Sequence, residues 1–144
     1  MKSPFKPLLL ILLFAGLVST AVFAGEPGYT NVDNAALKVL VDDGVKIVDV
    51  RRPDEWRTTG VIPGSALLTA FDANGRFNPD FPAAFEALVN RDESVVLICQ
   101  SGGRSTALAR ALSEQAGYTR IYNVAGGIAG WMEGGNPTVP CSQC

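Results

Sequence analysis

Histidine is absent from all 144 residues of the chain. Its absence excludes a cysteine–histidine nucleophile pair, a histidine general base and the imidazole ligands that most protein metal sites use. Cysteine is scarce, with Cys99, Cys141 and Cys144 as the three examples. A reactive cysteine in this chain must therefore be activated by backbone N–H groups, arginine or a helix dipole.

An excess of positive charge is also lacking. The chain has 12 basic and 14 acidic residues, and two of the basic residues, Lys2 and Lys6, lie at the extreme N-terminus. The remainder carries a net charge of about −4 at neutral pH. We therefore expect no nucleic-acid partner.

The first 24 residues have the composition of a secretory signal. Lys2 and Lys6 precede an apolar run from Leu8 to Val18, and the small side chains of Val22 and Ala24 suit a signal peptidase. The alternative is an uncleaved membrane anchor, but this run is shorter than the roughly 20 residues of a spanning helix. We expect cleavage after Ala24, no stable membrane insertion afterwards, and a periplasmic or secreted protein.

The remaining chain divides into one domain, residues 25–132, and a Gly/Pro-rich tail, residues 133–144, with a C-x-x-C pair. Helical and strand patterns alternate through the domain. After a polar lead at 25–30, helices are expected at 32–40, 53–56, 81–89, 106–116 and 128–132, and strands at 45–50, 66–68, 95–98 and 120–123. In the first helix Val39 is expected on the apolar face, and Asp33 is the candidate cap. This alternation predicts an α/β fold with a mainly parallel central sheet and helices on both faces. The segment 69–82 is irregular, and its Phe71 or Phe77 is placed to cover a pocket.

Cys99 lies between a buried strand, Val95–Ile98, and a helix for which Ser105 and Thr106 offer a cap. The backbone N–H groups of residues 100–105 are expected to turn inward around its sulfur and favour a thiolate. The alternative is an inert, buried core cysteine. In an oxidising compartment Cys141 and Cys144 would pair with each other and leave Cys99 free, while a tail thiol that reaches Cys99 as a sulfur relay ranks second.

Four separated motifs between Val45 and Trp131 resemble those of single-domain rhodaneses, which are sulfurtransferases. Each motif is weak alone, whereas all four in this order are specific. They are Asp49-Val50-Arg51 with Glu55-Trp56, then Gly60-Val61-Ile62-Pro63-Gly64-Ser65, then Cys99-Gln100-Ser101-Gly102-Gly103-Arg104-Ser105, and Asn123-Val124-Ala125-Gly126-Gly127 with Trp131.

The resemblance implies a rhodanese-like fold and a ping-pong reaction at Cys99. Cys99 would take a sulfane sulfur from a small anion such as thiosulfate or a polysulfide, and pass it from a persulfide to cyanide or a thiol. The loop that binds this persulfide would consist of Gln100, Ser101, Gly102, Gly103, Arg104 and Ser105. Gly102 and Gly103 would permit backbone geometry that other residues resist. Arg104 opposes the dipole at the start of the helix, so an anion is expected beside it. The reaction requires neither a metal nor an organic cofactor.

Two other functions remain open on the same resemblance. One is a non-catalytic rhodanese module that binds a partner or senses oxidation. The other, less favoured, is phosphatase or arsenate reductase chemistry, for which related enzymes use a loop one residue longer than the four residues between Cys99 and Arg104. Val61 stands where a histidine is usual in the family, at a position we interpret as structural.

The charged residues after the first buried strand have two interpretations. Arg51 and Arg52 lie at the edge of the sheet where ligands bind, so they could attract an anionic donor, and a surface role is the equal alternative. Asp49 and Glu55 are interpreted as structural. Gly126, Gly127 and Trp131 are expected to allow close packing.

Overall fold

A computed structural model describes residues 28–142 and 144 of the chain. The predicted signal peptide, residues 1–24, lies outside the described residues. Within the described part, no helix combines the length and the apolar character needed to cross a membrane.

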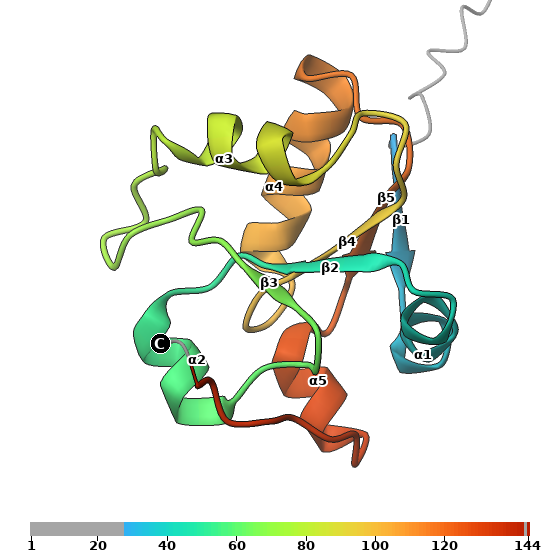
Figure 1. Cartoon of the computed structure of the whole chain (residues 1–144), viewed down its shortest axis with the longest axis vertical. Helices are drawn as coiled ribbons and strands as arrows, with labels where there is room; N and C mark the ends of the chain where they lie inside the picture. Colours follow the sequence, from blue (N-terminus) through green and yellow to red (C-terminus); the bar gives the residue numbers. More distant parts are fainter. Residues whose placement is uncertain (1–27, 143) are drawn as a thin grey trace, which may run out of the picture.

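Five parallel strands form a single sheet in the order β1-β5-β4-β2-β3 (Figure 1). Their bounds are β1 Tyr29–Val32, β2 Lys46–Asp49, β3 Ala66–Leu67, β4 Val95–Ile98 and β5 Ile121–Val124. All four residues of the central strand β4 are buried, because helices cover both of its faces. Parallel strands place their carboxyl ends at one edge. Asp49, the last residue of β2, and Cys99, which follows β4, therefore lie at the same edge of neighbouring strands.

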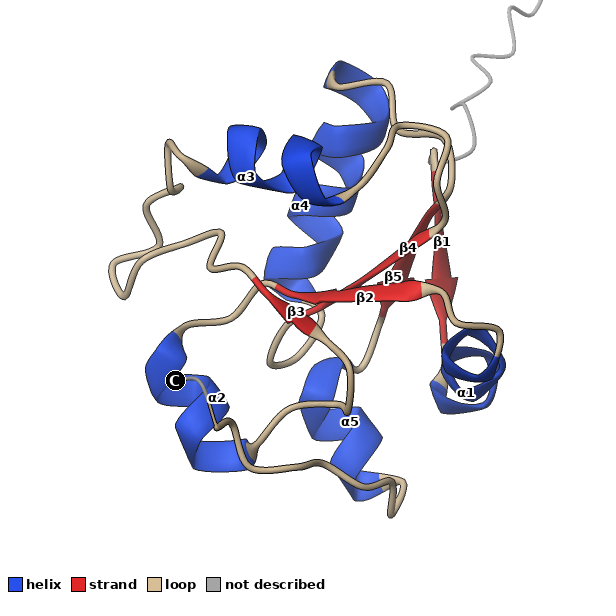
Figure 2. Ribbon diagram, in the orientation of Figure 1, coloured by secondary structure: helices blue, strands red, loops and turns tan. Residues whose placement is uncertain are grey.

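The helices are α1 Asn34–Asp42, α2 Pro53–Thr59, α3 Phe81–Leu88, α4 Gly103–Gln115 and α5 Gly127–Glu133. Helices α3 and α4 lie on one side of the sheet, and α1, α2 and α5 on the other (Figure 2). Two separate apolar clusters result, one around Phe85 and Leu108 and one around Leu37 and Ile128. The predicted parallel sheet with helices on both faces is confirmed.

Two local expectations at the start of the domain are wrong. Residues 29–32 form the edge strand β1, whereas the sequence predicts a polar lead up to residue 30 and a helix from residue 32. Only Val32 in this strand is buried, so its sequence has no apolar alternation. In α1 the core residue is Leu37, while Val39, predicted to face the core, is 59% exposed. The predicted cap by Asp33 is confirmed, because its carboxylate accepts a hydrogen bond from the Ala36 N–H at 2.9 Å.

The C-terminal tail folds back along α2, and the end of the chain lies beside that helix (Figure 1). Val61 and Val139 exchange two backbone hydrogen bonds of 2.9 Å, and the Thr138 hydroxyl donates to the Thr59 carbonyl. Gly60 is required at this contact, because a Cβ atom there would lie 2.5 Å from the Val139 oxygen. The backbone of Val61 therefore binds the tail to the loop after α2.

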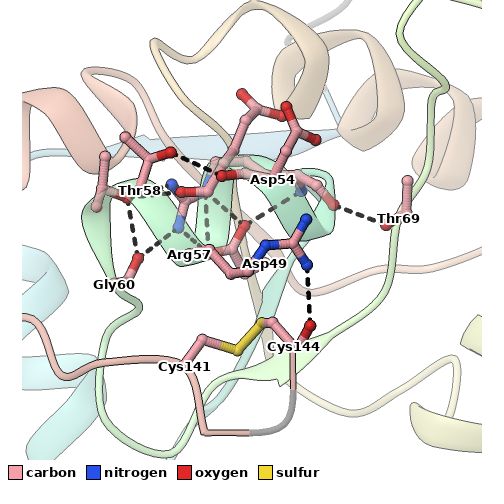
Figure 3. The surroundings of a disulfide bond; sticks show 11 residues. Asp49, Asp54, Arg57, Thr58, Gly60, Thr69, Cys141 and Cys144 are labelled. Carbon is pink, nitrogen blue, oxygen red and sulfur yellow. Dashed lines mark hydrogen bonds and ion pairs between the residues drawn. A yellow bond between two sulfur atoms is a disulfide. The ribbon is translucent and has the colours of Figure 1, made fainter.

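Cys141 and Cys144 form the predicted local disulfide (Figure 3). Their Cα atoms are 5.6 Å apart, and the Arg57 guanidinium donates to the Cys144 backbone oxygen at 2.9 Å. Cys99 is a free cysteine and is buried. The tail pair is therefore fixed against α2, and Cys99 keeps its thiol.

Candidate active site

The Cys99 sulfur is surrounded by hydrogen-bond donors from the start of α4. The N–H of Gly102 lies 3.2 Å from the sulfur, the N–H of Ser105 lies 3.4 Å from it, and the Ser105 hydroxyl lies 3.3 Å from it. The residue itself is 1% exposed. Few water molecules can therefore solvate the sulfur. The three protein donors replace water as the groups that can stabilise a negative charge on it.

The loop geometry depends on Gly102. Gly102 has φ +95°, in the left-handed region, and a Cβ atom there would lie 2.0 Å from the Ala125 carbonyl oxygen. Gly103 differs, because it begins α4 and a Cβ atom on it would meet nothing within 4 Å. The expectation that both glycines permit unusual backbone geometry holds for Gly102 and is wrong for Gly103.

The back of the loop is held by the N-terminus of α5. The N–H of Ile128 donates to the Cys99 carbonyl at 2.8 Å, and the N–H of Ala129 donates to the Gln100 carbonyl at 3.1 Å. Gly127 allows this approach, because a Cβ atom there would lie 2.5 Å from Gln100, which confirms its predicted packing role. Two loop carbonyls thus point away from the sulfur.

The N-terminus of α4 adds a favourable electrostatic field. The first N–H groups of a helix have no carbonyl partner within the helix, and α4 begins at Gly103, four residues after Cys99. Their aligned dipoles favour negative charge at this end of the 13-residue helix. Ser105 and Thr106 were expected to cap α4, but its N-cap is Gly102, and the Ser105 hydroxyl faces the sulfur instead.

Arg104 is fixed by Glu55, which the sequence indicated only as a structural residue. Two guanidinium nitrogens of Arg104 donate to the Glu55 carboxylate at 2.8 and 2.5 Å. Glu55 also accepts from the Arg52 N–H at 3.1 Å. The anion expected beside Arg104 is thus supplied in this structure by Glu55, and the pair joins α2 to the first turn of α4.

Glu55 titrates below its usual range. Burial raises the pKa of its carboxyl, but the hydrogen bonds from Arg104 and the Arg52 N–H outweigh that effect, so the pKa is lowered. The hydrogen bond to Glu55 in turn raises the pKa of Arg104. Both side chains are therefore charged at neutral pH.

We expect Glu55→Gln to lower the free energy of unfolding by about 1–2 kcal/mol at pH 7, because a charge-assisted pair is lost. A carboxyl whose pKa is lowered by folding contributes stability above its unfolded pKa, and this contribution disappears as pH falls through the folded pKa. The difference between wild type and variant should therefore shrink from pH 5 towards pH 3. Urea denaturation across that range measures it.

Glu93→Gln is the control for this experiment. The pKa of Glu93 is also lowered, chiefly by a hydrogen bond from Lys46, but that ion pair is one-third exposed. Its loss should cost less at pH 7. An effect of Glu55→Gln no larger than that of Glu93→Gln would contradict a strong pair at the loop.

Arg51 is not an anion-attracting or surface residue, and that prediction is wrong. It is fully buried and pairs with Asp49, with a shortest nitrogen–oxygen distance of 2.6 Å. Its remaining guanidinium hydrogen bonds go to the Thr59 hydroxyl at 2.7 Å and the Gly60 carbonyl at 2.9 Å. Arg51 therefore fastens the end of α2 to β2.

Of the other predicted site residues, some contact the Cys99 sulfur and others lie at the surface. Arg52 is partly exposed, and its guanidinium pairs with Asp54 at 3.0 Å and Glu55 at 3.4 Å, so two carboxylates compensate its charge. Ser101 is exposed, and Gln100 contributes its carbonyl to α5. Cys99, Gly102 and Ser105 form the inner site. Close packing at Gly127 is predicted from the sequence, but no local pattern identifies the Cys99 loop as its partner.

The chain is similar to known proteins in both sequence and fold. The model of the Rhodanese-like domain family covers residues 33–134. The chain belongs to this rhodanese-like family. Its family resemblance, predicted from four motifs, is thereby confirmed, as is sulfur transfer at the level of the family.

Three similar proteins illustrate the relationship. Thiosulfate sulfurtransferase GlpE of Actinobacillus pleuropneumoniae is 31% identical over 102 residues, which are 71% of this chain and 84% of that protein. Protein HIGH ARSENIC CONTENT 1 of Arabidopsis thaliana is 31% identical over 107 residues, and the match spans 72% of this chain and 62% of that protein. The crystal structure of a rhodanese-related protein from Thermoplasma volcanium aligns with a TM-score of 0.61 at 26% identity, covering 78% of this chain and all of that one.

Proposed function

We propose that this chain is an exported sulfurtransferase that carries sulfane sulfur as a persulfide on Cys99. The donor is a small anion such as thiosulfate or a polysulfide, and the acceptor is cyanide or a thiol. The observation that carries the proposal is the ring of three donors, from Gly102 and Ser105, around a free cysteine sulfur. Such a ring stabilises an anion without a metal.

In the first half-reaction the Cys99 thiolate attacks the outer sulfur of thiosulfate. A new sulfur–sulfur bond forms, and the sulfur–sulfur bond of thiosulfate breaks with its electron pair on the departing sulfite. The product is a persulfide anion on Cys99, one atom longer than the thiolate. The unpartnered N–H groups in the first turn of α4 favour negative charge at the loop.

In the second half-reaction the acceptor attacks the terminal sulfur. Cyanide becomes thiocyanate, or a thiolate becomes a persulfide, and the electron pair of the broken bond returns to Cys99 as a thiolate. The donors from Gly102 and Ser105 stabilise this leaving group. The enzyme returns to its starting state without net oxidation or reduction.

Intact mass after incubation with thiosulfate tests the proposal. The protein is kept free of reductant, so that its disulfide stays intact. We expect it to gain the mass of one sulfur atom and to release an equal amount of sulfite. It should lose the added sulfur when cyanide is supplied. Cys99→Ser should gain no sulfur and turn over no cyanide. The double variant Cys141→Ser/Cys144→Ser is the control and should gain one sulfur like the wild type.

The alternative functions give different results. A protein that acquires no sulfur from thiosulfate or polysulfide is a non-catalytic module, and the proposal is then wrong. Hydrolysis of an aryl phosphate or reduction of arsenate by the wild type, lost in Cys99→Ser, would also contradict it.

Export is proposed from the N-terminal sequence, and the disulfide between Cys141 and Cys144 supports it, since such bonds persist in oxidising compartments. Cell fractionation followed by N-terminal sequencing tests this part. A mature chain that starts at Gly25 outside the cytoplasm supports export, and an intact N-terminus in the cytoplasm contradicts it.

A further inference from the structure

An apolar groove of about 400 Å³ runs along α4 on the side that faces α3. One wall consists of three phenylalanine rings, from Phe71, Phe77 and Phe81. The other wall is α4, which presents small side chains at Ala107 and Ala111. Apolar pockets of this volume bury a side chain or a small molecule.

The aromatic wall is held in place before any ligand arrives. Phe71 and Phe77 pair across a short hairpin, and their rings meet edge to face with centroids 5.6 Å apart. The Asp72 carboxylate bonds the Arg76 guanidinium at 2.7 Å and the Arg76 N–H at 3.0 Å, so the tip is fixed by local contacts. Phe77 is nevertheless 46% exposed. A rigid aromatic side chain held at the surface is typical of binding sites, because little entropy is lost when a partner packs on it.

The groove begins close to the exposed end of the Cys99 loop at Gly103, which we call the loop mouth. Gly103 precedes Ala107 by four residues and Ala111 by eight on the same helix. Four residues of helix rise about 6 Å. The near end of the groove is therefore about one helical turn from the loop that would carry the persulfide.

Neither small substrate of the proposed reaction needs this groove. Thiosulfate and cyanide are anions, and phenylalanine and alanine side chains offer them no hydrogen bond. A thiol acceptor is larger than these anions, and it must bring its sulfur to the loop. An apolar groove beside the loop therefore suits the acceptor side of the reaction.

We propose that the acceptor is a protein thiol, and that an apolar side chain close to its cysteine binds in the groove between Phe77 and α4. This inference rests on the proposed sulfur transfer. An extended peptide advances about 3.4 Å per residue. A cysteine at the loop mouth thus places a side chain two or three residues away over Ala107 and Ala111.

Two short peptides test the proposal as acceptors for the Cys99 persulfide. Both contain one cysteine; one has a phenylalanine three residues from it, and the other has alanine at that place. We expect wild-type protein to transfer sulfur to the phenylalanine peptide with at least about tenfold higher kcat/KM, since one buried aromatic contact supplies that much. The preference should fall to about twofold or less in Phe77→Ala and in Ala111→Glu.

The controls separate this proposal from the reaction on which it rests. Val39→Ala removes a comparably exposed apolar side chain from α1, on the other face of the sheet, and should keep the preference. Thiosulfate–cyanide turnover should be unchanged in all three variants. If wild type turns over cyanide but treats both peptides alike, or if Phe77→Ala and Ala111→Glu keep the preference, the groove is not an acceptor site although sulfur transfer stands.

Two further outcomes also decide the question. Absence of any persulfide contradicts the proposed function itself, before the peptides are compared. Self-association of wild type that Ala111→Glu abolishes would assign the groove to a second copy of the chain and overturn the acceptor proposal.

Discussion

Gly102→Ala is expected to lower the free energy of unfolding by about 2–5 kcal/mol and to abolish most persulfide formation. A left-handed backbone costs an alanine about 1–2 kcal/mol, and forcing a methyl group into a packed contact costs about 1–3 kcal/mol more. The contact is with the backbone of Ala125, 2.0 Å from the added atom, so no side chain can swing away. Relief requires the loop to shift, which removes the Gly102 N–H from the Cys99 sulfur.

Gly103→Ala is the matched control. The added methyl group meets nothing within 4 Å, and alanine suits the first turn of a helix at least as well as glycine. Its stability should lie within about 1 kcal/mol of the wild type, and it should still gain one sulfur. Urea denaturation and intact mass measure both variants. Equal behaviour of Gly102→Ala and Gly103→Ala would show that the loop tolerates a different backbone.

Arg51→Met is expected to lower the free energy of unfolding by about 3–5 kcal/mol, because it leaves the carboxylate of Asp49 buried without its partner. Both side chains are fully buried. The substitution also removes the hydrogen bonds to Thr59 and Gly60, and so loosens α2 from β2. Urea or thermal denaturation measures the loss.

Two further variants identify the cause of this effect. Arg76→Met breaks an arginine–aspartate pair of similar length, 2.7 Å, whose arginine side chain is 77% exposed, and should cost less than about 1 kcal/mol. The double variant Asp49→Ala/Arg51→Met should lose less free energy of unfolding than the two single variants lose in total, since no unpaired charge remains. Additive losses would argue against a direct coupling of Asp49 and Arg51.

The sequence predicts most reliably where local pattern and burial agree. Val95–Ile98 is an unbroken apolar run, so its burial on both faces and its place at the centre of the sheet follow from composition alone. The loop after Cys99 was predictable for a different reason, since its glycines and arginine resemble the corresponding rhodanese motif. The α/β class and the reactive loop were therefore both predictable.

The expectations that failed depend on contacts between different elements of the fold, most of them far apart in the sequence. Arg51 looks like a surface residue in the sequence, yet Thr59 and Gly60 complete its hydrogen bonds in the interior. Arg104 looks free to bind an anion, yet its partner Glu55 lies 49 positions earlier. Among the strands that the structure describes, β1 pairs only with β5, nearly a hundred residues later, and has no strong pattern of its own. Such pairings are decided by tertiary packing, which local patterns do not record.

Because α5 supports the Cys99 loop, the loop cannot be completed until α5 has been synthesised. Ile128 and Ala129 support the loop, and Val139 lies against Gly60, but the ribosome adds these residues well after Cys99 itself. While the chain is still growing, the loop has neither its rear support nor the tail that packs on α2. The sulfur site therefore cannot take shape before α5 is present, and a chain that ends before α5 has the Cys99 loop without its support.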